Sequence, residues 1–139
     1  MSEQEQLVRD AMVRDPFSLP ATASAQEAGE ALIRPEVRAV LVCDGGRLVG
    51  VITRKTLVGQ VVAKGLDPRT TTLGEIAEPP NATLDSATSL AEAYAFLELE
   101  DLERVPVTED GRLVGVLSRS GVQRRLAEDE PPPDPDDEP

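Results

Sequence analysis

The stretch Gly46-Arg-Leu-Val-Gly-Val-Ile-Thr-Arg54 decides the fold, because the chain repeats it 65 positions later as Gly111-Arg-Leu-Val-Gly-Val-Leu-Ser-Arg119. Seven of the nine residues are identical in the two copies. A repeat at a fixed spacing indicates the architecture of a protein before any single residue indicates its chemistry. We therefore expect two copies of one structural unit.

Each copy predicts a β-hairpin that leads into a helix. The turns Asp44-Gly45-Gly46 and Glu109-Asp110-Gly111 precede the two stretches, and their last glycine can adopt a positive φ. The apolar run that follows is rich in β-branched residues, which favour a strand. It ends at a hydroxyl residue, Thr53 or Ser118, which can cap the next helix.

The remaining elements occur in the same order on both sides of the repeat. The first copy predicts a short helix over 5–14, an extended piece over 17–19, a helix that starts at the capping box Ser24–Glu27 and ends near Arg34, a buried strand over 38–43, and a helix from Leu57 to a C-terminal cap at Gly65. The second copy predicts a short helix over 73–76, an extended piece over 82–84, a second capping box at Ser89–Glu92, a strand over 104–108 and a closing helix over 119–127.

This order predicts an α+β fold of two tandem β-α-β-β-α repeats. Each unit has only about 60 residues, too few to bury a good core alone, so the two should pack with pseudo-twofold symmetry. We expect the first repeat, with its N-terminal linker helix, to span 1–66 and the second to span 67–127. Residues 128–139 contain only Pro, Asp and Glu, which predicts a disordered acidic tail.

Composition excludes several classes of function. The formal charge of −12 arises largely from the tail, and the rest of the chain has a net charge of about −5, which argues against a nucleic-acid surface. The chain has no histidine, so imidazole catalysis and histidine-ligated metals are excluded. Its one cysteine, Cys43, lies in an apolar run and is expected in the core. No apolar run is long enough to span a membrane, which predicts a cytoplasmic protein.

The doubled pattern resembles a tandem pair of CBS domains, often called a Bateman module. The resemblance covers residues ~8–127 and rests on the repeated hairpin, the Ser-x-x-Glu-Ala helix starts and Arg104-Val-Pro-Val107. It implies a stand-alone regulatory module that binds AMP, ATP, S-adenosylmethionine or a related small anion between its repeats. It also implies a homodimer. The lack of histidine and of metal-ligand spacing separately predicts no metal site and no catalytic residue.

The resemblance also implies a set of ligand-binding residues, and the chain departs from the family pattern within it. The expected residues are Ser18, Val40, Leu41, Thr53, Arg54, Thr56, Thr83, Arg104, Pro106, Ser118 and Arg119. The family motif (Gly)-x-x-(Thr/Ser)-x-x-Asp uses its Asp to bind the ribose. Here Thr56 and Gly121 occupy the two Asp positions, and Leu41 replaces the first of the two usual prolines. The first cleft is the better candidate, because it keeps a hydroxyl.

Each of these residues also has a structural interpretation. Thr53 and Ser118 could be helix caps, ligand contacts or both. Arg54, Lys55 and Arg119 lie at expected helix N-termini, where they could bind phosphate or remain exposed. Ser24, Glu27, Ser89 and Glu92 are interpreted as capping residues only. The alternative function is a degenerate pair that serves as a dimerisation or docking module for an unidentified protein without binding nucleotide. Without an activating base beside any nucleophile, an enzyme is not expected.

Overall fold

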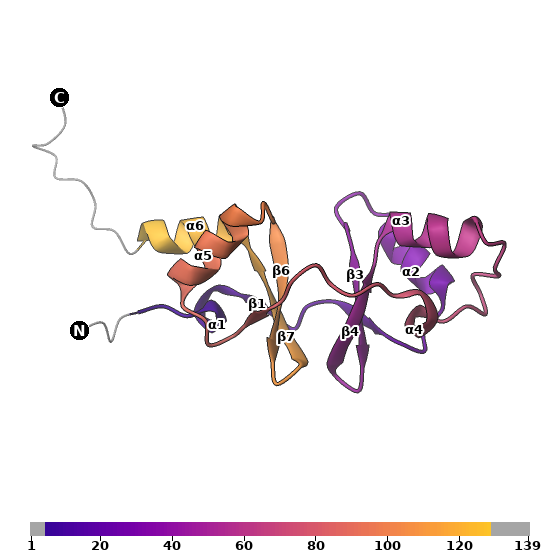
Figure 1. Ribbon diagram of the computed structural model, residues 1–139, viewed down its shortest axis with the longest axis horizontal. Helices are drawn as coiled ribbons and strands as arrows, with labels where there is room; N and C mark the ends of the chain where they lie inside the picture. Colours follow the sequence, from indigo (N-terminus) through magenta and orange to yellow (C-terminus); the bar gives the residue numbers. More distant parts are fainter. Residues whose placement is uncertain (1–4, 129–139) are drawn as a thin grey trace, which may run out of the picture.

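The computed structural model describes residues 5–128, which form two α+β halves lying side by side (Figure 1). The hairpins of the two halves are adjacent at the centre, and the helices lie toward the outer ends. The predicted acidic tail lies outside the described residues, apart from Glu128 at the end of the last helix. No helix within residues 5–128 combines the length and apolar character needed to cross a bilayer.

The two halves contain the predicted elements in matching order. The first half has α1 (Val8–Ala11), β1 (Val13–Arg14), β2 (Ser18–Pro20), α2 (Ala25–Leu32), β3 (Val40–Asp44), β4 (Arg47–Ile52), α3 (Arg54–Leu57) and η1 (Val58–Val62), a π-helical turn. The second half has α4 (Leu73–Ile76), β5 (Leu84–Asp85), α5 (Leu90–Leu99), β6 (Arg104–Glu109), β7 (Arg112–Ser118) and α6 (Arg119–Glu128). The α+β repeat architecture predicted from the sequence is confirmed.

The described strands form one seven-stranded sheet, whose two halves are joined where β4 pairs with β7 at the tips of the hairpins. The strand order is β2-β3-β4-β7-β6-β5, with β1 paired to β7. Strands β2 and β5 run parallel to their neighbours, whereas the two hairpins are antiparallel. At the tips, the Leu48 amide donates to the Gly111 carbonyl (3.1 Å) and the Leu113 amide donates to the Gly46 carbonyl (3.0 Å). The two hydrogen bonds are related by the 65-residue offset, as an approximate twofold axis requires.

Both hairpin turns require a positive backbone φ, which residues with a side chain rarely adopt. Gly45 and Gly46 have φ values of 59° and 88°, and the equivalent Asp110 and Gly111 have values of 51° and 83°. Positive φ at both central positions is the type I′ geometry, which matches the twist of the flanking strands. The turn predicted from the acidic and glycine residues is therefore confirmed.

Two aliphatic cores hold the molecule together, and each includes a helix from the other half of the sequence. The first core gathers Leu32, Val40 and Ile52, and it also contains Leu73 and Ile76 of α4. The second core likewise includes Val8 of α1, which comes from the first half of the sequence. The second core consists of Val8, Leu90, Ala93, Leu97, Val105, Val107, Leu117 and Val122. Helix α1, at the start of the first repeat, therefore packs in the second core, and α4, at the start of the second repeat, packs in the first.

The capping boxes are formed to different degrees. Ser24 Oγ accepts from the Glu27 amide (3.2 Å), and the Glu27 carboxylate accepts from the Ser24 amide (2.8 Å), so the first box is complete. Ser89 Oγ accepts from the Glu92 amide (3.2 Å). Among the described residues, the returning bond from the Ser89 amide to the Glu92 carboxylate is not formed, so only half of the second box is confirmed.

Two predicted helices differ from those observed. The helix predicted over 5–14 is wrong in extent, because α1 ends at Ala11 and Val13 instead pairs with Val116 of β7. This tertiary pairing competes with the local helical pattern and prevails. The helix that begins at Arg54 continues as the π-turn η1 beyond Leu57, and Gly65 (φ 69°) terminates it as predicted.

Candidate functional site

The strand-end hydroxyl of the first repeat starts a helix. Thr53 Oγ1 accepts from the Thr56 amide (3.2 Å), and Thr56 Oγ1 accepts from the Thr53 amide (3.0 Å). Together the two threonines form a capping box at the N-terminus of α3. The capping interpretation of Thr53 is therefore confirmed, and a ligand contact by the same hydroxyl remains a prediction.

A carboxylate from elsewhere in the chain lies beside the position where the family motif has its Asp. The Thr56 side chain is only 2% exposed, and its hydroxyl donates to Glu78 Oε1 at 2.5 Å. Glu78 lies on the segment between the repeats, where it exchanges both backbone hydrogen bonds with Val51 of β4 (2.8 and 3.0 Å). Thr56 and Glu78 together therefore provide a hydroxyl and an acid at the end of β4.

The second repeat lacks both of these groups. Ser118 Oγ accepts from the Gly121 amide (3.0 Å), which confirms a capping role for Ser118. Gly121 has no side chain, and the residue equivalent to Glu78 is Val13, which pairs with Val116. The C-terminal ends of β4 and β7 thus carry different polar groups, although their backbones correspond.

Arg54 and Arg119 have equivalent structural roles. The Arg54 guanidinium donates to the backbone carbonyls of Leu32 and Arg34 at the C-terminal end of α2. Arg119, 65 positions later, donates to the carbonyl of Leu97 near the end of α5 (3.5 Å). A cation at a helix C-terminus satisfies free carbonyls and is favoured by the helix dipole. Both arginines therefore join the last helix of their repeat to the end of the helix before it.

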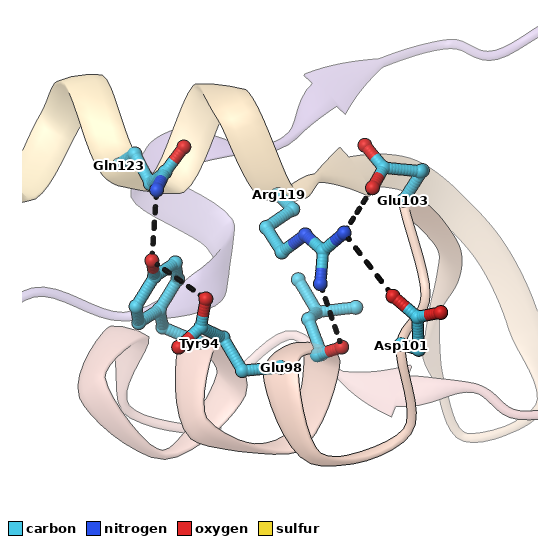
Figure 2. A network of polar contacts seen from close by, with 7 residues as sticks. Tyr94, Glu98, Asp101, Glu103, Arg119 and Gln123 are labelled. Carbon is cyan, nitrogen blue, oxygen red and sulfur yellow. Dashed lines mark hydrogen bonds and ion pairs between the residues drawn. The ribbon is translucent and has the colours of Figure 1, made fainter.

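Arg119 also lies among acidic side chains, as Figure 2 shows. It forms ion pairs with Glu103 and, at 3.5 Å, with Asp101. The hydrogen bond to Glu103 is the main cause that raises the pKa of the Arg119 guanidinium above its ordinary range. The phosphate contacts expected of Arg54 and Arg119 remain predictions, and any phosphate there would compete with these partners.

Arg104 differs from the other two arginines. It begins β6 directly opposite Ser118 of β7, so the fold brings two predicted site residues together. Its side chain is exposed, and it has neither an ion pair nor a hydrogen bond to any of residues 5–128. Arg104 therefore remains available to an anion at the second repeat.

The other predicted site residues fall at corresponding places in the two halves of the sheet. Ser18 of β2 is in register with Leu41 of β3, and Pro106 of β6 is in register with Val116 of β7. Thr83 is exposed just before β5. Val40 is fully buried in the first core, so its side chain cannot reach a ligand and only its backbone could.

An open cleft of about 410 Å³ lies between the repeats beside the first hairpin turn. It is lined by Asp15, Pro16, Ser18, Pro20, Cys43, Gly45, Gly46 and Leu113. Burial raises the pKa of the Cys43 thiol, and a hydrogen bond with Ser18 partly opposes this shift. Of the predicted site residues only Ser18 borders this cleft, because β4 separates the turn from Thr53 by about 20 Å at the rise of a strand.

Sequence reasoning missed Glu78 and the arginine contacts. Glu78 precedes two prolines in a segment without periodicity, so nothing local indicated a partner. The arginine contacts did leave a signal in the sequence. The pair Leu32 and Arg54 is repeated 65 positions later as Leu97 and Arg119. A pair of positions repeated together at one offset is consistent with a shared contact.

The geometry defines a protein of two β-α-β-β-α repeats related by an approximate twofold axis, with unlike polar groups at the two strand ends. The CBS domain matches the chain twice, over residues 8–63 and 73–128, and the chain belongs to this family. The resemblance inferred from the repeated hairpin is thereby confirmed.

Known relatives support the same assignment. Hypoxic response protein 1 of Mycobacterium tuberculosis is 35% identical over 108 residues, which cover 77% of this chain and 73% of that protein. A crystal structure of Hypoxic Response Protein I with two coordinated zinc ions has a TM-score of 0.73 at 29% identity, covering 87% of this chain and 99% of that one. The crystal structure of CBSX2 in complex with AMP has a TM-score of 0.70 at 25% identity, covering 88% and 97%.

Proposed function

We propose that this chain is a regulatory module that binds an adenosine nucleotide, or another small anionic ligand, between its repeats. Thr53 and Glu78, at the C-terminal end of β4, would contact the ligand, and the buried Thr56 would position the Glu78 carboxylate. The observation that carries the proposal is the hydrogen bond from the buried Thr56 hydroxyl to the Glu78 carboxylate. A carboxylate can accept the two hydroxyls of a ribose, which Thr56 alone cannot do.

Family membership and the AMP complex of CBSX2 support a nucleotide as the ligand class. ATP and S-adenosylmethionine are alternatives that share the adenosine part. Zinc, named for the mycobacterial relative, is less well supported here. The chain has no histidine, and residues 5–128 contain no group of three or more acidic or cysteine side chains arranged to hold a metal.

The position of Glu78 suggests how occupancy could be transmitted. Glu78 lies on the segment that connects the repeats, and its backbone pairs with Val51 of β4. A ligand that draws the Glu78 carboxylate from Thr56 acts on this connecting segment. Such a ligand shifts the conformation only by its difference in affinity for two states. In this proposal the output of the module is a change of conformation that a partner protein detects.

Thermal unfolding with millimolar AMP, ATP or S-adenosylmethionine tests the proposal. A ligand that binds only the folded state raises the unfolding midpoint by mass action. We expect a rise with at least one of the three, and a smaller rise in Glu78→Gln. Glu92→Gln is the matched control, because Glu92 is an exposed acid of the second repeat, and it should respond like the unchanged protein.

The alternative is a module that binds protein partners and has lost its nucleotide site. Gly121 and Val13 leave the second strand end without counterparts of the Thr56 hydroxyl and the Glu78 acid, which favours this function for that end. If the unfolding midpoint is unchanged with all three ligands, the alternative is favoured for the whole chain.

A further inference from the structure

Two arginines lie opposite each other where the halves of the sheet are joined. Arg47 begins β4 and Arg112 begins β7, and the two are Cα partners in the pairing of these strands. The hydrogen bonds between the hairpin tips are donated by Leu48 and Leu113, the residues that follow the arginines. The arginines are therefore a non-hydrogen-bonded pair, the kind in which opposite side chains are closest. We call Arg47 and Arg112 the arginine pair.

Each arginine of the pair reaches over the turn of the other hairpin. A Cβ at Gly46 would lie 3.1 Å from Cζ of Arg112, and a Cβ at Gly111 would lie 2.9 Å from Cζ of Arg47. Each guanidinium thus occupies space that a side chain at the other hairpin's glycine would fill. Figure 1 places the two hairpins next to each other at the centre of the molecule. The arginine pair is therefore built by both repeats, and neither repeat contains it alone.

The arginine pair brings two positive charges together without a partner. Both side chains are exposed, and neither has a hydrogen bond or an ion pair to any of residues 5–128. Among the cross-strand pairs of this part of the chain, it is the one that sets like charges directly opposite each other. Like charges at opposite positions destabilise a sheet. An anion held by both guanidiniums removes this cost, so its binding stabilises the junction between the repeats.

The neighbouring acids do not neutralise the arginine pair. Asp44 of β3 is the Cα partner of Arg47, and Glu109 of β6 is the Cα partner of Arg112. Each arginine instead extends toward the other hairpin, and it forms no ion pair with the acid beside it. The Glu109 carboxylate accepts a hydrogen bond from the Ser86 hydroxyl (2.9 Å). Both guanidiniums therefore keep their donors for a further anion.

The chemistry of two guanidiniums selects the kind of anion. Each guanidinium presents a planar fork of N–H donors that matches carboxylate or phosphate oxygens. A carboxylate has two oxygens and one negative charge, so it satisfies one fork. A phosphate dianion has more oxygens and two negative charges, so it can satisfy both forks and neutralise both cations. We propose that the arginine pair binds a phosphate-type dianion across the junction of the two repeats.

This site is separate from the one assigned to a nucleotide. Arg47 is at the start of β4, whereas Thr53 follows its last residue, so the strand separates them by about 20 Å. Arg112 and Ser118 are likewise at opposite ends of β7. The dianion site therefore does not depend on the hydroxyl and acid at the C-terminal end of β4, and each site can be tested without the other.

Calorimetric titration with inorganic phosphate, at constant ionic strength and with chloride as the reference salt, tests the site. The unchanged protein should bind phosphate, and acetate, which has a single charge, should bind far more weakly. Arg47→Gln and Arg112→Gln should each weaken phosphate binding about tenfold or more, as expected for the loss of a charged donor. Arg9→Gln is the matched control and should bind like the unchanged protein. The Arg9 side chain is also exposed and has no hydrogen bond or ion pair within residues 5–128. Thermal melts establish that the variants are folded.

Further variants separate the geometry of the site from its charge. Arg112→Lys keeps the charge but loses the planar fork, so it should weaken phosphate binding, though less than Arg112→Gln. Asp44→Asn and Asp110→Asn each remove an exposed carboxylate near the arginine pair and should strengthen binding. Glu78→Gln, which alters the proposed nucleotide site, should bind phosphate like the unchanged protein. Absence of phosphate binding in the unchanged protein, equal weakening by Arg9→Gln and Arg112→Gln, or loss of binding in Glu78→Gln would overturn the proposal.

Discussion

Val51 and Val116 occupy equivalent places, and each forms an antiparallel pair with a segment that enters its half from outside the hairpin. Val51 pairs with Glu78, and Val116 is in register with Val13. Val51 and Val116 are 65 positions apart in the sequence, and so are their partners Val13 and Glu78. The approximate twofold relation therefore extends beyond the hairpins to the segments that connect the halves.

The repeated glycines Gly50 and Gly115 permit this close approach. A Cβ at Gly50 would lie 2.9 Å from the Glu78 carbonyl oxygen and 2.8 Å from the Ala77 Cβ. A Cβ at Gly115 would lie 2.8 Å from the Val13 carbonyl oxygen. Both glycines are thus required by the neighbouring backbone and not by an unusual φ.

Gly50→Ala should destabilise the protein by about 1–3 kcal/mol, because the backbone of the connecting segment must shift to admit the methyl group. Gly59→Ala is the matched control, since nothing lies within 4 Å of a Cβ at that helical position. There alanine should be neutral or stabilising by up to about 1 kcal/mol. Urea denaturation measures both free energies of unfolding, and equal effects would contradict the role assigned to Gly50.

Thr56→Val should cost about 1–3 kcal/mol, because it removes a buried hydroxyl that bonds to both Thr53 and Glu78. Valine keeps the shape of the side chain, so the loss reports the hydrogen bonds rather than a cavity. Thr83→Val, at an exposed position, should change the free energy of unfolding by less than about 0.5 kcal/mol. If both variants unfold alike in urea, the Thr56 hydroxyl has no structural role.

The sequence predicted those parts of the molecule that depend on nearby residues. The turn at Gly45 and Gly46 and the capping box at Ser24 follow from residues within four positions, so they could be recognised directly. The repeat then supplied the twofold arrangement, because two small units must share their apolar faces.

The remaining features depend on partners far along the chain. Arg54 reaches carbonyls 20 and 22 positions away, and Thr56 reaches Glu78, also 22 positions away. Local pattern indicated only a cation and a hydroxyl in a first helical turn. The same limitation explains why Val13, helical by periodicity, forms a strand with Val116.

Arg54→Ala should lower the free energy of unfolding by about 1 kcal/mol, because the carbonyls of Leu32 and Arg34 lose a charged donor. Arg104→Ala removes a side chain that has no hydrogen bond or ion pair within residues 5–128, so it should have little effect on stability. If Arg104 contacts a ligand, its variant should instead reduce the ligand-induced rise in the unfolding midpoint. Equal loss of stability in the two variants would argue against the helix-end contact.

The Cys43 thiol should react slowly with a thiol reagent at pH 8. Burial raises its pKa above the ordinary 9.0, so little thiolate forms and the reagent has poor access. Rapid labelling is expected only after unfolding in urea, which provides the control in the same sample. Because the folded pKa is raised, this group's contribution to stability is present below about pH 9 and declines as the pH rises through the folded value. Fast labelling of the folded protein would contradict the burial of this thiol.

Glu75 should make the stability of the chain sensitive to acid. Its carboxylate accepts from the amide and the hydroxyl of Thr72 (2.8 Å each), and these bonds hold its pKa below the ordinary 4.5. The folded state therefore binds fewer protons than the unfolded state near pH 4. This contribution is present above pH 4.5 and is lost as the pH falls through the folded pKa. Urea denaturation of Glu75→Gln should show lower stability than the unchanged protein at pH 7 and a smaller difference at pH 3. Glu92 lacks the returning bond to its capping serine, so Glu92→Gln is the control and should show no such convergence between pH 7 and pH 3. If the stability difference of Glu75→Gln is the same at both pH values, the charged capping bond is not its cause.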